Sequence, residues 1–190
     1  MNFDFNYYEP VKVFFGKGKL SELGENAKLY GKKALIVTTN TGLFSNKSKL
    51  IDKVRKNLKE SKMDSEVFAD ISPNPLSTQI DEGARFGQET NCDVIIGLGG
   101  GSAIDAAKGI AIAMGHNKPI WDYCPGTQEN VLSPTAKTLP IITIVTTSGT
   151  GSHVTSFSVV TNPEKKEKPG LGSDYIFPKF SISFLHFGHL

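Results

Sequence analysis

One stretch in the middle of the chain, residues 93–108, constrains the fold more than any other. It reads Asp-Val-Ile-Ile-Gly-Leu-Gly-Gly-Gly-Ser-Ala-Ile-Asp-Ala-Ala-Lys, which is an apolar run, then glycines and a serine, then an alanine-rich segment with helical spacing. This order predicts a buried strand, a tight glycine turn and the start of a helix. The first turn of a helix has unsatisfied N–H groups and the positive end of the dipole, so the turn is a candidate anion site.

The glycine turn offers the groups that a phosphate needs. Because Gly99, Gly100 and Gly101 lack a Cβ, a phosphate can approach their backbone closely, and Ser102 can cap the helix and donate a hydroxyl. The alternative is a purely structural turn whose glycines supply positive φ angles. Three glycines and a serine after a buried strand favour the phosphate interpretation. The spacing is not G-x-G-x-x-G, so the common dinucleotide fingerprint does not apply.

Strand-like and helix-like segments alternate before this turn. Such alternation predicts a Rossmann-like α/β fold, in which a parallel sheet has helices on both faces and binds ligands outside the carboxyl ends of its strands. The expected strands are residues 7–16, 33–39 and 67–69, and the expected helices are residues 21–29, 48–59 and 78–89. In the first strand, Val11, Val13 and Phe15 are expected on one side.

A second loop rich in hydroxyls follows a later strand. Residues 140–145 form an apolar run, and residues 146–152 read Thr-Thr-Ser-Gly-Thr-Gly-Ser. The carboxyl ends of parallel strands share one edge of a sheet, so we expect this loop beside the glycine turn, with one ligand between them. A plain Ser/Thr turn is the alternative. A β-hairpin region is expected next, with strands at residues 154–161 and 175–182 and a polar turn at 162–168.

Composition narrows the functional classes. Hydrophobic residues make up 38% of the chain, charged residues 21%, and the net charge is +2. No basic cluster indicates nucleic-acid binding, and no apolar run reaches the length of a membrane span. The two cysteines, Cys92 and Cys124, are too few for a disulfide framework, so the cytoplasm is the expected compartment.

Three motifs together resemble the iron-containing (group III) alcohol dehydrogenases. They are Gly-Gly-Gly-Ser-x-x-Asp-x-x-Lys from Gly99, the Pro-Asn-Pro at residues 73–75 and the Thr/Ser/Gly loop at residues 146–152, and the match spans about residues 13–182. Glycerol dehydrogenase and dehydroquinate synthase are more distant relatives. The resemblance implies an N-terminal α/β domain that binds NAD(P). It also implies a C-terminal helical domain that holds Fe²⁺ or Zn²⁺ through one Asp and three His, with hydride transfer between a small alcohol or aldehyde and nicotinamide.

The resemblance also implies which residues contact the cofactor. Gly99, Gly100, Gly101 and Ser102 would bind the pyrophosphate, whereas Asp105 of the same motif is expected to be structural. The other positions at which relatives contact the dinucleotide are Asn74, Thr146, Thr147, Ser148, Thr150, Thr155 and Lys168. For Lys168 the alternative is an ordinary solvated lysine at a hairpin tip.

The choice between NAD and NADP depends on one position in the family. Members that prefer NAD often carry an Asp after the second strand, where this chain has Thr39 followed by Asn40. Without that carboxylate nothing repels a 2′-phosphate, so NADP is admitted and slightly favoured.

The chain departs from the family pattern at three places, the first of which is Val145, where relatives usually have Pro. His153 stands where relatives usually have Glu, and it is interpreted as an ordinary polar residue and not as a metal ligand. Residues 183–190 do not continue into the family's Asp-Pro turn, and His186 and His189 do not align with its ligand motif. We therefore expect a dinucleotide-binding domain at residues 1–182 and a non-family tail at 183–190, produced by a frameshift or truncation.

Two classes of function fit these residues. The first is an NAD(P)-dependent, iron-type dehydrogenase acting on a small primary alcohol or aldehyde, butanol-like in character; turnover by these 190 residues alone is not expected, because the metal ligands would lie in the other domain. The second is a non-catalytic dinucleotide-binding module. A glycerol dehydrogenase or dehydroquinate synthase type of relative is a further option. A homodimer through residues 11–15 rests on analogy with the family.

Overall fold

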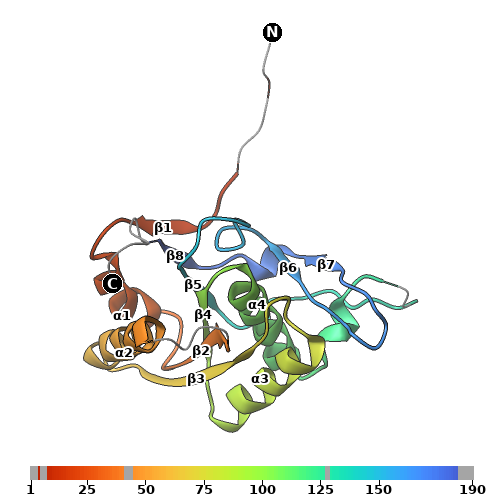
Figure 1. Ribbon diagram of the computed structural model, residues 1–190, viewed down its shortest axis with the longest axis horizontal. Helices are drawn as coiled ribbons and strands as arrows, with labels where there is room; N and C mark the ends of the chain where they lie inside the picture. The colour runs from red at the N-terminus through yellow and green to blue at the C-terminus, as the bar shows by residue number, and fades with distance from the viewer. Residues whose placement is uncertain (1–3, 5–7, 41–44, 127–128, 184–190) are drawn as a thin grey trace.

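The structure, a computed structural model, describes residues 4, 8–40, 45–126 and 129–183. Its centre is a six-stranded sheet in the order β1-β8-β5-β4-β2-β3, in which every neighbouring pair is parallel (Figure 1). The sequence pattern predicts five of these strands, and the sixth, residues 180–183, comes from a segment that was expected in the hairpin. The strands are β1 (Lys12–Phe15), β2 (Lys33–Thr39), β3 (Asp64–Ile71), β4 (Val94–Gly99), β5 (Ile141–Val145) and β8 (Phe180–Ser183).

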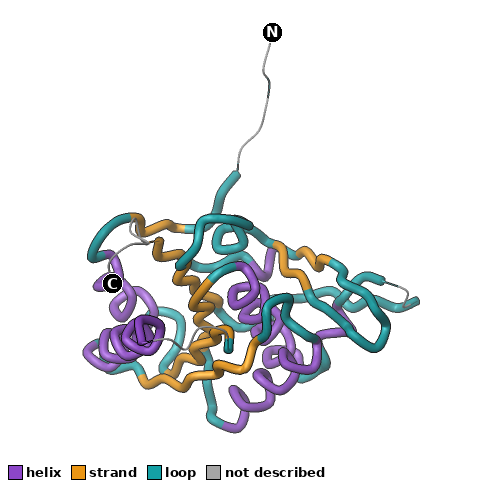
Figure 2. Tube along the Cα trace, viewed as in Figure 1, coloured by secondary structure: helices purple, strands orange, loops and turns teal. Residues whose placement is uncertain are grey.

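Helices cover both faces of the sheet, which confirms the predicted Rossmann-like architecture. The pair α1 (Leu23–Ala27) and α2 (Ser45–Glu60) lies on one face, and α3 (Ser77–Glu89) and α4 (Gly101–His116) lie on the other (Figure 1, Figure 2). Three short 3₁₀ segments complete the helical elements, at Lys19–Glu22, Ile120–Tyr123 and Asp174–Ile176. No helix in the described part of the chain is long and apolar enough to cross a membrane.

The two faces of the sheet explain why the central strands are apolar throughout. In β4 the side chain of Ile95 belongs to the core under α3 and α4, whereas its neighbour Ile96 belongs to the core under α1 and α2. Successive side chains of a strand point to opposite faces, so a strand covered on both sides needs apolar residues at every position. The apolar runs in the sequence are therefore the signature of this two-sided core.

The edge strand β1 differs from the predicted alternation. Val11 is buried, but Val13 and Phe15 are 44% and 60% exposed, so they do not continue one buried face. The inward residue is Phe14, whose ring packs edge-on against Phe180 with centroids 5.6 Å apart. β1 is an edge strand with a neighbour on one side only, which agrees with the exposure of these two side chains.

The expected β-hairpin exists, but its second strand was wrongly predicted. β6 (Phe157–Val159) pairs antiparallel with β7 (Gly170–Gly172), not with residues 175–182. The latter segment forms the 3₁₀ turn Asp174–Ile176 and then β8, which enters the main sheet parallel to β1 and β5. All four β8 residues are buried, and burial of this kind is available only in the sheet centre.

The topology fixes where a ligand can sit. From β2 the chain moves outward to β3, then returns to the other side of β2 to form β4 and continues to β5. The direction of travel thus reverses between β2 and β4. In open α/β sheets such a switch point leaves a crevice at the carboxyl ends of the two strands, and the glycine turn after β4 lies there.

Candidate functional site

The glycine turn joins β4 to α4 through one strained glycine. Gly99 has a φ of +144°, a value that L side chains rarely adopt. Gly100 is extended and precedes the helix as its N-cap residue, and α4 begins at Gly101. The prediction that Ser102 caps the helix is wrong, because Ser102 already lies in the first helical turn. Its Oγ instead accepts a hydrogen bond from the backbone N–H of Asn74 at 3.2 Å.

The hydroxyl-rich loop after β5 lies directly against this turn, as expected. The N–H of Thr146 donates to the carbonyl of Gly99 at 3.0 Å. A Cβ on Gly100 would stand 2.8 Å from Oγ1 of Thr147, and a Cβ on Gly101 would stand 2.8 Å from Oγ1 of Thr150. A Cβ at position 101 would also lie 2.9 Å from Cγ2 of Thr150, so that side chain would have to move, whereas at position 100 only the Thr147 hydroxyl is in the way. A positive φ favours glycine only at position 99 of this turn.

A third segment reaches the same place from the α3 side. Asn74 has a φ of +59° between Pro73 and Pro75, and its Oδ1 accepts a hydrogen bond from Nζ of Lys168 at 2.7 Å. Lys168 belongs to the turn between β6 and β7 and is exposed, yet it crosses to Asn74 and does not extend freely into solvent. The hairpin, the Pro-Asn-Pro loop and the glycine turn thus meet through Lys168, Asn74 and Ser102.

Two of the remaining predicted residues lie farther along the second loop. Ser148 is exposed between Thr147 and Thr150. Thr155 lies close to the start of β6, and its backbone carbonyl accepts a hydrogen bond from Nζ of Lys108 at 2.7 Å. The structure therefore brings the predicted residues of the three loops to one edge of the sheet, with Thr155 on the α4 side of the second loop.

Sequence reasoning did not find the buried Lys108 behind this loop or the contacts that it shares with Asp105. Lys108 is 0% exposed, and its ammonium contacts backbone oxygens of the second loop. Asp105 lies one turn earlier in α4, and its Oδ1 accepts from the hydroxyl of Ser152 at 2.5 Å. A signal was present: these two residues are the only charges between residues 103 and 114 and stand three apart, so they share one helix face.

Burial shifts the ionisation of both groups. Desolvation lowers the pKa of Lys108 to about 8, and the charge of Asp105 partly opposes that shift. Desolvation also raises the pKa of Asp105, against the opposing effects of the Ser152 hydrogen bond and the Lys108 charge. Near neutral pH Lys108 remains protonated, because its pKa stays above 7.

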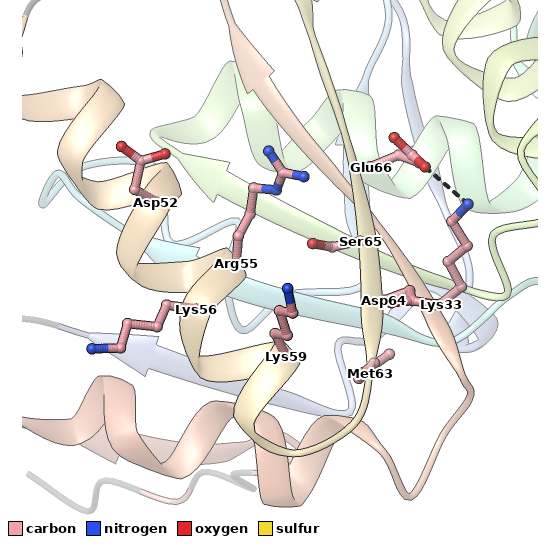
Figure 3. A pocket seen from close by; sticks show the side chains of 9 residues that line it. All are labelled: Lys33, Asp52, Arg55, Lys56, Lys59, Met63, Asp64, Ser65 and Glu66. Atoms are coloured by element: carbon pink, nitrogen blue, oxygen red, sulfur yellow. Dashed lines mark ion pairs between the residues drawn. The ribbon is translucent and has the colours of Figure 1, made fainter.

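A separate hollow of about 520 Å³ lies between α2 and β3. Figure 3 shows Arg55 and Lys59 extending from α2 toward β3, while Nζ of Lys33 pairs with Glu66 at 2.9 Å. Because Lys33 and Asp64 are the first residues of β2 and β3, the hollow lies at the amino ends of these strands. The glycine turn follows the carboxyl end of β4, so the two features occupy opposite edges of the sheet. The complete lining is Lys33, Asp52, Arg55, Lys56, Lys59, Met63, Asp64, Ser65 and Glu66.

The described residues do not fit a metal ion. Within residues 8–40, 45–126 and 129–183, no group of three or more His, Cys, Asp and Glu side chains comes together as a ligand set. Burial, with a smaller effect of the Lys108 charge, lowers the pKa of His153. The backbone carbonyl of His153 accepts from Thr143 Oγ1 at 3.1 Å. His186 and His189 lie outside the described residues.

A doubly wound sheet with a glycine turn at its switch point is the architecture of dinucleotide-binding α/β proteins. The family model described as iron-containing alcohol dehydrogenase matches residues 10–183. The chain therefore belongs to the iron-containing alcohol dehydrogenase family, as its motifs predict.

Curated relatives show the extent of the match. The chain is 38% identical to NADH-dependent butanol dehydrogenase A of Clostridium acetobutylicum over 178 residues, which is 94% of this chain and 44% of the relative. It is 36% identical to 1,3-propanediol dehydrogenase of Citrobacter freundii, covering 94% of this chain and 45% of the relative. The chain thus spans less than half the length of these relatives.

Solved structures agree on fold and extent. An archaeal halo-thermophilic alcohol dehydrogenase from a Red Sea brine pool superposes with a TM-score of 0.88 at 40% identity, covering 97% of this chain and 47% of that protein. Sulfoacetaldehyde reductase of Bifidobacterium kashiwanohense, solved in complex with NAD⁺, gives a TM-score of 0.81 at 33% identity, covering 96% and 46%.

Proposed function

We propose that this chain is the dinucleotide-binding part of an NAD(P)-dependent alcohol dehydrogenase, with the pyrophosphate on residues 99–102. The observation that carries the proposal is the meeting of three loops at the N-terminus of α4, at the switch point of the sheet. The unsatisfied N–H groups and the positive dipole end of a 16-residue helix face the phosphates there.

The remaining predicted residues take roles that follow from their positions. Lys168 supplies a cation above the turn, and Asn74 orients that cation through its 2.7 Å hydrogen bond. The hydroxyls of Thr146, Thr147, Ser148 and Thr150 line the opposite side as donors to phosphate and ribose oxygens. Thr155 contributes to cofactor binding through its backbone, whose carbonyl accepts a hydrogen bond from Nζ of Lys108.

The substrate class follows from the family. Curated relatives are named butanol, 1,3-propanediol and methanol dehydrogenases, which supports a small primary alcohol or aldehyde, butanol-like, as hydride donor or acceptor. The described residues offer no ligand set for iron or zinc, so no catalytic step is assigned to a metal here. What these residues do is bind the dinucleotide and orient it at the edge of the sheet.

Coenzyme choice is the finer part of the proposal. Relatives are named NADH-dependent, which supports NAD as a ligand. The absent carboxylate at Thr39 supports NADP as a ligand too, slightly favoured over NAD. Thr39 is the last residue of β2, the strand beside β4 at the switch point, and this position supports Thr39 as a neighbour of the adenosine ribose.

The alternative is a non-catalytic dinucleotide-binding module, which the lack of a described ligand set favours for these residues alone. Fluorescence titration with NADH and NADPH tests the binding that both functions share, and butanal reduction with added Fe²⁺ tests for catalysis. Turnover would exclude the non-catalytic module, whereas binding without turnover fits both, because a dinucleotide-binding part is not expected to turn over alone. If neither dinucleotide binds, both are wrong.

Three variants locate the ligand. Gly101→Ala places a Cβ 2.8 Å from Oγ1 of Thr150, so it should push the second loop away and raise the dissociation constant at least tenfold. Gly170→Ala is the matched control, because a Cβ there meets nothing within 4 Å. The double change Arg55→Gln and Lys59→Gln tests the hollow between α2 and β3 instead. A loss of affinity in that double variant but not in Gly101→Ala would move the phosphate site to the hollow.

We also propose a homodimer and a cytoplasmic location. Exposed Val13 and Phe15 on the edge strand β1 support a contact between two copies, to be tested by light scattering of Phe15→Lys, which should shift the mass toward the monomer. The two buried cysteines, neither in a disulfide, support a reducing compartment.

A further inference from the structure

The ammonium of Lys108 is completely enclosed by the loop that follows β5. Its Nζ donates to the backbone carbonyls of Ser152, Thr155 and Phe157, each at 2.7 Å. An ammonium has three N–H donors, so these carbonyls use all of them. The chain from Ser152 to Phe157 therefore curls around one positive charge that comes from the middle of α4.

Asp105 fixes the same loop from the preceding turn of α4. Its carboxylate accepts from the hydroxyl of Ser152, and its backbone carbonyl accepts from the hydroxyl of Ser158 at 2.9 Å. The backbone N–H of Ser152 in turn donates to Oγ1 of Thr150 at 3.2 Å. Continuous contacts thus lead from Lys108 through Ser152 to Thr150, which lies against Gly101.

Burying the Lys108 ammonium costs free energy, and accurate placement of the loop is a reason for the protein to keep it. Burying an ammonium is unfavourable without full hydrogen bonding, and an apolar residue would fill the middle of an apolar helix at lower cost. The loop between β5 and β6 has no regular secondary structure of its own over residues 146–156. Charge-assisted bonds to three carbonyls are stronger than neutral ones, so they can order a segment that no strand or helix orders.

We infer that Lys108 is a positioning residue for the cofactor, since its ammonium holds residues 152–157 on α4 and thereby keeps Thr147 and Thr150 over the glycine turn. The inference rests on the proposed function, because the ligand that benefits is the dinucleotide. Lys108 itself is fully buried and does not touch the ligand. With the loop already in place, binding does not have to order it, and the affinity rises accordingly.

The test compares the chain with three variants in dinucleotide affinity and in hydrogen exchange of residues 146–157. Lys108→Met removes all three donors and should raise the NADH dissociation constant at least tenfold while exchange in the loop accelerates. Lys108→Gln keeps an amide donor and should give a smaller rise. Leu58→Ala, on the opposite face of the sheet, is a stability control that should leave both readouts at the wild-type level. If Leu58→Ala weakens NADH binding as much as Lys108→Met does, the effect is general destabilisation and the inference is wrong.

Ser152→Ala covers the case in which Lys108→Met does not fold. It removes the hydroxyl that donates to Asp105 and that accepts from Nζ of Lys108 at 3.4 Å, and it keeps the Ser152 carbonyl, so it should raise the dissociation constant two- to fivefold with faster exchange in the loop. Wild-type affinity in the folded variants, with or without faster exchange, would overturn the inference. Failure of the unsubstituted chain to bind either dinucleotide is a different result, since it overturns the proposed function and the named ligand together.

Discussion

Nζ of Lys168 and Oδ1 of Asn74 form a 2.7 Å hydrogen bond that joins residues 94 positions apart in the chain. Asn74 stands in the left-handed region, and its backbone N–H donates to Ser102 in the first turn of α4. One asparagine therefore connects the hairpin to the glycine turn. Lys168 is thus positioned by a tertiary hydrogen bond toward the glycine turn, whereas Lys165 of the same hairpin turn lies over the ring of Trp121.

Charge removal at Lys168 should weaken dinucleotide binding. We expect Lys168→Gln to raise the NADH dissociation constant about fivefold, since a charge-assisted bond at an exposed site contributes about 1 kcal/mol. Lys166→Gln is the control, because it removes the same charge from the same turn. Among the described residues, the lysine that bonds Asn74 is Lys168 and not Lys166. If a fluorescence titration finds equal effects of the two variants, Lys168 contributes only through the net charge of the turn, and its specific role at the ligand is wrong.

The local parts of the fold were predictable from sequence. The strand at residues 33–39 was predicted with its observed bounds, and helix α3 was predicted within one residue, because apolar periodicity is a local property. The glycine turn was also predicted, since residues 93–108 contain the strand, the turn and the helix in one continuous stretch. Patterns within one element do not require knowledge of its neighbours.

The misses share one physical cause, which is that pairing partners are not encoded in periodicity. Residues 175–182 contain an apolar segment, yet only the assembled sheet offers residues 180–183 a buried place between β1 and β5. Ser102 fits a capping pattern, but the extended backbone at Gly100 starts the helix earlier. Lys108 is recognisable as a loop anchor only when Ser152, Thr155 and Phe157 are known to surround it.

Coenzyme choice should change with one charge at the end of β2. Thr39→Asp places a carboxylate near the adenosine ribose, so it should weaken NADPH binding at least tenfold, about 1.4 kcal/mol, through repulsion of the 2′-phosphate. NADH affinity should stay the same or rise, because the carboxylate can accept from the ribose hydroxyls. Thr39→Asn has the same shape without the charge and should leave the NADPH to NADH ratio close to that of the wild type. A ratio that Thr39→Asp leaves unchanged would place the ribose elsewhere.

The buried Lys108 makes stability depend on alkaline pH. Its pKa is lowered from 10.5 to about 8 in the folded chain, so between these values the unfolded chain binds more protons. The contribution of Lys108 to the unfolding free energy should therefore rise with pH across this window, by up to about 3 kcal/mol at 1.36 kcal/mol per pH unit. Urea denaturation of wild type and Lys108→Met at pH 7.5, 8.5 and 9.5 measures this contribution as the difference between their unfolding free energies. The difference cancels the titration of the other lysines, which both proteins share. A difference that stays flat or falls with pH contradicts the expectation.

Close packing of α4 on β4 should make Gly97 intolerant of any side chain. A Cβ at this position would lie 3.0 Å from Cβ of Ala107 and 3.1 Å from Cα of Ile104, and the second of these atoms belongs to the helix backbone. Strand and helix must then separate, and overpacking of this kind costs about 1–3 kcal/mol. We expect Gly97→Ala to lower the unfolding free energy by that amount in urea denaturation. The α4 N-terminus should move when the helix shifts, so NADH affinity should fall as well.

Gly170→Ala, whose Cβ meets nothing within 4 Å, is the control and should change stability by less than about 0.5 kcal/mol. Equal stability of the two variants would show that α4 can shift on β4 at no cost, and the glycine turn would then not be rigidly placed by its own strand and helix.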